Sequence, residues 1–224
     1  MSTNNDQYSI YAVSRELVNE VCGIARVEDH GGFPVPSLLS QSEKRLLIRS
    51  VFSYIEALSY LLKVHALSET EGSTISSAEK MIAEEVTFEL GDDGTVKARP
   101  AKLRTISNIR FAFKVFKKAS GSSFELNLDS NGWQCIQRSL KVRDRLTHPK
   151  GLSDLTVLDN EYDDSYKAFI WFERQMMLAM EARIQALRET NRALRVERGL
   201  EPIEPEAKSS RPAAKRPDHL DDDV

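Results

Sequence analysis

The segment from Arg138 to Lys150 gathers the residue types with which this chain could do chemistry. It holds one histidine and five cations at the end of a predicted helix: His148, Arg138, Lys141, Arg143, Arg145 and Lys150. Asp144 lies four residues before His148, so on a helix its carboxylate can reach the imidazole and orient it, as partners in acid–base sites do. Arg143 lies five residues before His148, about 140° around an ideal helix. The guanidinium and the imidazole therefore converge only where the helix loosens, and Pro149 supplies that loosening.

Two opposing influences act on the protonation state of His148. The surrounding cations favour a neutral imidazole, which accepts a proton near pH 7, whereas Asp144 favours the charged form. A bound phosphate would shift the balance toward the charged form, as a base that later acts as an acid requires. The structural alternative is that the Lys and Arg side chains at this helix end only stabilise its dipole.

The remaining sequence excludes several classes of protein. Its 224 residues, 41% hydrophobic and 29% charged, predict a globular domain of ordinary size with extensions. It contains no serine-hydrolase, phosphate-loop, dinucleotide or zinc-protease motif, and Cys22 and Cys135 lie too far apart to form a zinc site or a disulfide framework by themselves. Without a long apolar run or a secretory signal, the chain is expected to be cytoplasmic and to make no membrane contact.

Charge is distributed in blocks along the chain. Residues 101–150 carry eleven Lys or Arg against three Asp or Glu, a local balance of +8, whereas residues 1–100 carry −6 and residues 151–173 carry −5. This asymmetry indicates a face that attracts a polyanion. The alternative is that the helices simply have basic, solvated faces.

Apolar residues recur with helical spacing over most of the chain. The pattern predicts an all-α, up-and-down bundle of four to six helices with a long C-terminal helix. A small hairpin near 86–99, around Gly91-Asp92-Asp93-Gly94, is the other element considered. The expected helices are a first one through Val13 and Ile24, then 41–67 behind a Ser40/Glu43 capping box, 77–89, one through Ile106 and Phe116, 130–147 and 160–198.

These elements divide the chain into four parts. Residues 1–39 hold the N-terminal helix and a linker, and 40–180 form the helical bundle. Residues 181–199 extend the last helix, and 200–224, rich in proline and ending in acidic residues, are expected to be disordered.

The last helix carries a two-stranded coiled-coil pattern. Its apolar residues alternate three and four apart, and a polar asparagine at an a position fixes register: Met177, Met180, Ile184, Leu187, Asn191 and Leu194. This pattern predicts either self-association or packing on the chain's own bundle.

The segment Arg143–Lys150 resembles the Arg-(Asn/Asp)-x-x-x-His signature of HEPN domains, which are small helical bundles. Three further stretches look like the branch of that family associated with prokaryotic toxin and defence loci: the helix segment 49–58, the segment 108–114 and Gly151–Leu155 after the histidine. The resemblance covers residues 40–180.

The resemblance implies a metal-independent endoribonuclease without a cofactor, acting as a homodimer in which two Arg…His motifs face one cleft. His148 would accept the proton of a ribose 2′-hydroxyl, Arg143 would stabilise the phosphorane, and Asp144 would orient one of them. Phosphate contacts would come from Lys141, Arg145 and Lys150. The implied partners are RNA, a second copy of the chain, and an antitoxin or another defence protein.

An alternative of a different class also follows from the resemblance. Family members that keep the bundle can act as nucleotide-binding, scaffolding or antitoxin-partner modules. The chain would then be a non-catalytic dimeric interaction module, and the Arg/His cluster would serve as an anion site. Glu56, on the long helix, either approaches the cleft or is simply solvated or hydrogen-bonded.

Overall fold

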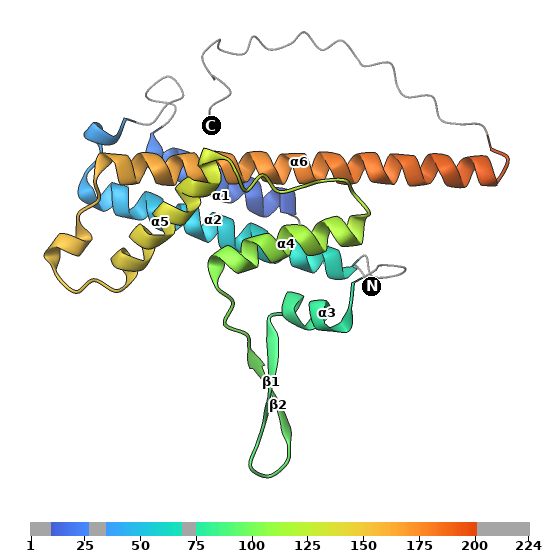
Figure 1. Cartoon of the computed structure of the whole chain (residues 1–224). Coiled ribbons are helices and arrows are strands. Elements are labelled where there is room, and N and C mark those ends of the chain that lie inside the picture. The colour runs from blue at the N-terminus through green and yellow to red at the C-terminus, as the bar shows by residue number, and fades with distance from the viewer. Residues whose placement is uncertain (1–9, 27–34, 69–74, 201–224) are drawn as a thin grey trace, which may run out of the picture.

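The computed structural model describes residues 10–26, 35–68 and 75–200, which form six α-helices and one two-stranded sheet (Figure 1). The protein is therefore mainly α-helical, as the sequence predicts. Most of the predicted linker before residue 35 and the predicted tail from residue 201 lie outside the described residues. The elements are α1 (Ile10–Ala25), α2 (Gln41–Ser68), α3 (Ser77–Ala83), β1 (Val86–Leu90), β2 (Val96–Pro100), α4 (Thr105–Ser120), α5 (Asn131–Thr147) and α6 (Asp159–Glu197), with 3-10 turns at Pro36–Leu38 and Leu152–Leu155.

Helix α2 lies at the centre of the core because it is buried on more than one face. Its predicted apolar stripe is buried along its whole length: Leu47, Val51, Tyr54, Leu58 and Leu61. Phe52 and Ile55, on other faces, are buried too. The predicted capping box is confirmed, since Glu43 accepts from the Ser40 N–H at 2.7 Å and Ser40 Oγ accepts from the Glu43 N–H at 3.3 Å.

The other long helices pack around α2, which contacts α1, α4, α5 and α6, and α5 also packs along α6. Gly132, in the first turn of α5, permits the close approach to α6. A Cβ atom at this position would lie 2.3 Å from the indole ring of Trp171, so any larger residue would push the two helices apart.

The β-hairpin projects from the bundle below α3 (Figure 1). Its strands are antiparallel, with Val86 opposite Pro100 and Leu90 opposite Val96. The prediction of a helix over 77–89 is wrong beyond Ala83. The chain turns at Glu85, whose φ of 56° is left-handed, and its carboxylate accepts a bond from the buried Lys63 Nζ at 2.5 Å. This tertiary contact fixes the turn where the local periodicity would continue the helix.

Helix α6 has 39 residues, which at about 1.5 Å per residue span about 58 Å. Its far end extends beyond the other helices (Figure 1). Four apolar side chains of the coiled-coil pattern are exposed along the second half of α6, and we call them the α6 seam: Met177, Ile184, Leu187 and Leu194. Within the described ranges, no helix is long and apolar enough to cross a bilayer.

Candidate functional site

The end of α5 presents His148 to solvent. The helix runs to Thr147, and His148 itself has left the α region, with φ −127° and ψ 61°. Its backbone N–H still donates to the Asp144 carbonyl at 3.1 Å, so the last turn is closed although the helix stops before Pro149. The exposed imidazole is therefore held on an ordered backbone with its ring open to a ligand.

Arg143 is held in place by three neighbours. Its Nη2 donates to the carboxylate of Glu56 on α2, and its Nη1 donates to Asp144 Oδ1 at 3.1 Å. The guanidinium carbon also lies 5.6 Å from the ring centroid of Phe52, a cation–π contact. The side chain keeps 27% of its surface exposed. A guanidinium fixed on one side and open on the other can still offer its remaining N–H groups to a phosphate.

In this structure the Asp144 carboxylate accepts a hydrogen bond from Arg143. The contact expected between its carboxylate and the His148 imidazole is not found among the hydrogen bonds of the described residues, nor is a direct bond from Arg143 to His148. The two candidate catalytic side chains thus share one helix end without a hydrogen bond between them among the described residues.

The three residues expected to contact phosphate differ in availability. Lys141 and Lys150 are exposed, and the Lys150 backbone N–H donates to Asp154 at 2.7 Å, which orders the loop after the histidine. Arg145 instead bonds Glu161 at 2.8 Å and the Thr156 carbonyl at 3.0 Å. Its guanidinium thus joins α5 to the start of α6, and a substrate contact of Arg145 stays a prediction.

The rest of the basic block is also partly neutralised. Arg138 forms a two-bond pair with Asp164, at 2.7 and 2.8 Å, and this contact lowers the pKa of the Asp164 carboxyl. Burial, with a smaller contribution from the Asp164 carboxylate, raises the pKa of the neighbouring Cys135 thiol to about 11. Six of the eleven cations have no carboxylate partner within the described part of the chain: Lys102, Arg104, Arg110, Lys114, Lys141 and Lys150.

A polar cavity of about 440 Å³ borders the site. Glu56, the partner of Arg143, is part of its wall, together with Tyr60 one turn further along α2 and Asn108 of α4. The fully buried Lys63 lies behind this wall and donates to Asn108 at 2.7 Å.

Phe52, Glu56 and Tyr60 recur every four residues on one face of α2, and this face both holds Arg143 and forms the cavity wall. Sequence reasoning missed Phe52 and Tyr60, and the four-residue spacing around Glu56 was the signal for them.

Comparison with protein-family models, with curated proteins and with solved structures found no match for this chain.

Proposed function

We propose that the protein is a metal-independent endoribonuclease of the HEPN type, acting as a homodimer in a toxin or phage-defence role. One observation carries the proposal. Arg143 is anchored by Glu56, Asp144 and Phe52 yet remains partly exposed, at the same helix end that presents the exposed His148. A fixed guanidinium beside an accessible imidazole provides the two groups that RNA cleavage through the ribose hydroxyl needs.

In the proposed reaction, His148 accepts the proton of a ribose 2′-hydroxyl. The 2′ oxygen attacks the adjacent phosphorus, and Arg143 stabilises the doubly charged phosphorane. The bond to the 5′ oxygen then breaks, and the imidazolium of His148 gives its proton to this oxygen and becomes neutral again. The products are a 2′,3′-cyclic phosphate and a 5′-hydroxyl. Asp144 and Glu56 act as positioning residues, and Lys141 and Lys150 contact flanking phosphates.

The proposed homodimer follows from what one copy lacks. Among the described residues, no hydrogen bond joins Arg143 to His148, and the side chains of the α6 seam stay about half exposed. A second copy would bring further arginine, histidine and lysine side chains into one cleft. An antitoxin or another defence protein remains part of the proposal as a regulating partner.

The test is cleavage of single-stranded RNA by the purified full chain with EDTA present. We expect cyclic-phosphate ends by mass spectrometry, no cleavage of the 2′-deoxy strand, and at least a 100-fold lower rate for His148→Ala and Arg143→Ala. Arg99→Ala, which changes an exposed arginine of the hairpin, is the control and should match the parent. Parental rates in both site variants would overturn the catalytic assignment.

The second candidate is a non-catalytic interaction module. It is favoured by the Arg143–Glu56 pair, which joins α5 to α2 as a purely structural arginine would. It predicts no cleavage under any of these conditions, with RNA or nucleotide binding that weakens as salt is raised.

A further inference from the structure

The β-hairpin has one apolar face and one polar face. Side chains alternate along each strand, and opposite residues of the two strands share a face. One face therefore carries only apolar residues, and we call it the apolar hairpin face: Val86, Phe88 and Leu90 of β1 with Val96, Ala98 and Pro100 of β2. The other face carries only polar ones: Thr87, Glu89, Lys97 and Arg99. On the apolar face Phe88, Leu90 and Val96 are 53%, 71% and 68% exposed.

This exposure indicates a docking surface. A two-stranded hairpin is only marginally stable by itself in water, and contiguous exposed apolar side chains mark surfaces that bind a partner. The hairpin projects from the helices (Figure 1), so its own bundle leaves the face open. Its tip carries Asp92 and Asp93, both exposed and without an ion pair among the described residues. The tip repels a polyanion such as RNA, and the face fits an apolar protein surface bordered by cations.

The second half of α6 offers an apolar surface of this kind. The α6 seam begins in a groove of about 680 Å³ between α1 and α6. Met177 and Ile184 of the seam line this groove, and Tyr11 and Val18 line it from α1. Methionine side chains adapt their shape to a partner, so the groove can take a large apolar side chain such as that of Phe88.

A basic stripe runs beside the seam. Arg188, Arg192 and Arg195 are spaced four and three residues apart, so they lie on one side of the helix. Arg188 and Arg192 are exposed, and neither has a carboxylate partner within the described part of the chain.

The lengths of the two surfaces agree. Arg192 follows Ile184 by eight residues, a rise of about 12 Å along a helix. Asp92 follows Phe88 by four residues, about 13 Å along a strand. A hairpin with Phe88 in the groove and its tip directed outward along α6 therefore places Asp92 beside Arg192.

The seam suits a hairpin better than a second α6. In the parallel two-stranded coil that Asn191 favours, Arg183 of one helix would face Arg188 of the other, and symmetry would repeat this contact. Like charges at these positions oppose pairing. The hairpin instead brings carboxylates to the arginines.

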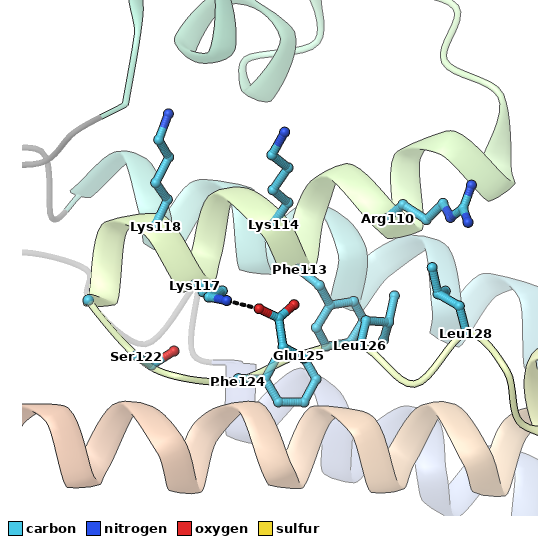
Figure 2. Close-up of a pocket in the computed structure, with 11 residues that line it drawn as sticks. Arg110, Phe113, Lys114, Lys117, Lys118, Ser122, Phe124, Glu125, Leu126 and Leu128 are labelled. Atoms are coloured by element: carbon cyan, nitrogen blue, oxygen red, sulfur yellow. Dashed lines mark hydrogen bonds and ion pairs between the residues drawn. The ribbon is translucent and has the colours of Figure 1, made fainter.

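The hollow of about 630 Å³ between α4 and segment 122–128 fits the hairpin less well (Figure 2). Its Lys117 is paired with Glu125 of the same hollow, and its Lys114 is directed away from the apolar side chains Leu126 and Leu128. These two cations therefore do not border an apolar surface as those of α6 do.

We propose that the apolar hairpin face of one copy docks on the α6 seam and the basic stripe of a second copy. Two such contacts related by a two-fold axis close the dimer, whereas a one-way contact would leave a hairpin and a seam open and add further copies in a chain. The inference rests on the proposed homodimer but not on RNA cleavage, because none of these residues belongs to the proposed active site.

The first test is disulfide cross-linking between two variants of the full chain. Both carry Cys22→Ser, because the other cysteine, Cys135, is buried. One also carries Leu90→Cys and the other, with a mass tag, Leu187→Cys. A disulfide needs Cα atoms within about 7 Å, so after oxidation with copper phenanthroline the mixed pair should exceed, about fivefold or more, that formed when Lys97→Cys on the polar face replaces Leu90→Cys.

The second test is the dimer dissociation constant, measured by light scattering and sedimentation without RNA. Phe88→Ser should raise it about tenfold or more, whereas Thr87→Ser, which places the same residue on the polar face, should leave it unchanged. Asp92→Asn should raise it about threefold and weaken its dependence on salt.

The outcomes separate this contact from its alternatives. Cross-links only between two Leu187→Cys chains would mean that α6 pairs with itself, and those only between two Leu90→Cys chains would mean that hairpins pair. Either result, a monomeric parent, or a parental dissociation constant for Phe88→Ser overturns the inference. A dimer with these contacts that does not cleave RNA would refute the ribonuclease alone.

Discussion

The ion pair between Arg143 and Glu56 allows a quantitative test of the proposed site. The two side chains are 27% and 44% exposed, so their pair is neither a free surface ion pair nor a buried one. Exposed pairs contribute about 0.2–1 kcal/mol and hydrogen bonds to charged groups about 1.5–3 kcal/mol. We therefore expect a coupling energy of about 1 kcal/mol. Arg143→Ala also loses the contact with Phe52, so its total cost should be about 1.5–2 kcal/mol.

The assay is a double-mutant cycle in which Arg143→Ala, Glu56→Ala and the double variant are unfolded in urea and followed by tryptophan fluorescence. Cleavage rates measured on the same proteins separate positioning from stability. Glu56→Gln keeps an oxygen that accepts from Nη2, so it should retain more activity than Glu56→Ala. A coupling energy inside the additivity error of about 0.3–0.5 kcal/mol would refute the claim that Glu56 holds Arg143.

Three further predictions concern packing, pH and assembly. Gly132→Ala places a methyl group against Trp171 and should destabilise the fold by about 1–3 kcal/mol in urea unfolding, whereas Gly23→Ala, with nothing within 4 Å of its new Cβ, should stabilise α1 by about 0.5–1 kcal/mol. Equal effects would contradict the close helix contact. Hydrogen bonds, first from Lys118 and then from the Ser76 backbone, lower the pKa of Glu79 from 4.5 to about 2. The stability that this carboxylate contributes is present above pH 4.5 and is lost as the pH falls toward 2, so Glu79→Gln should flatten the acid side of the stability curve. Leu187→Lys should produce monomers by light scattering if the α6 seam forms the dimer, and an unchanged mass would move the interface to the bundle.

The long helices could be predicted closely from local pattern. The sequence predicts a helix over 41–67 and α2 spans Gln41–Ser68, because an unbroken stripe and a capping box define its body and its start. The hairpin near 86–99 is also indicated by the local turn signal Gly91-Asp92-Asp93-Gly94, but the end of α3 at Ala83 could not be predicted in this way. We attribute the turn at Glu85 to its bond with Lys63, which is 22 residues earlier in the chain and buried. A local window contains the strand-forming residues that follow but not the contact that ends the helix.

In the candidate site, too, local sequence predicts the features within one segment but not the contacts between distant segments. Helical spacing and Pro149 locate Arg143 and His148 at one helix end, as the structure shows. The partner of Arg143 lies 87 residues away, so no spacing rule within the segment could identify Glu56 as its anchor. A count of charges also cannot separate an arginine that is free from one that is paired, so the ion pair between Arg145 and Glu161 could not be predicted.

The ion pairs within residues 101–150 leave fewer cations that could contact RNA. Of the cations expected around His148, only Lys141 and Lys150 have no carboxylate partner among the described residues, and each cation that contacts single-stranded RNA adds only a modest, salt-sensitive increment to affinity. Two such contacts would hold a strand weakly, and the proposed second copy would double them and add a second histidine and arginine. The neutralisation of Arg138 and Arg145 by α6 is thus a physical reason for the proposed ribonuclease to act as a dimer. One protomer uses too many of its cations to hold its own helices together.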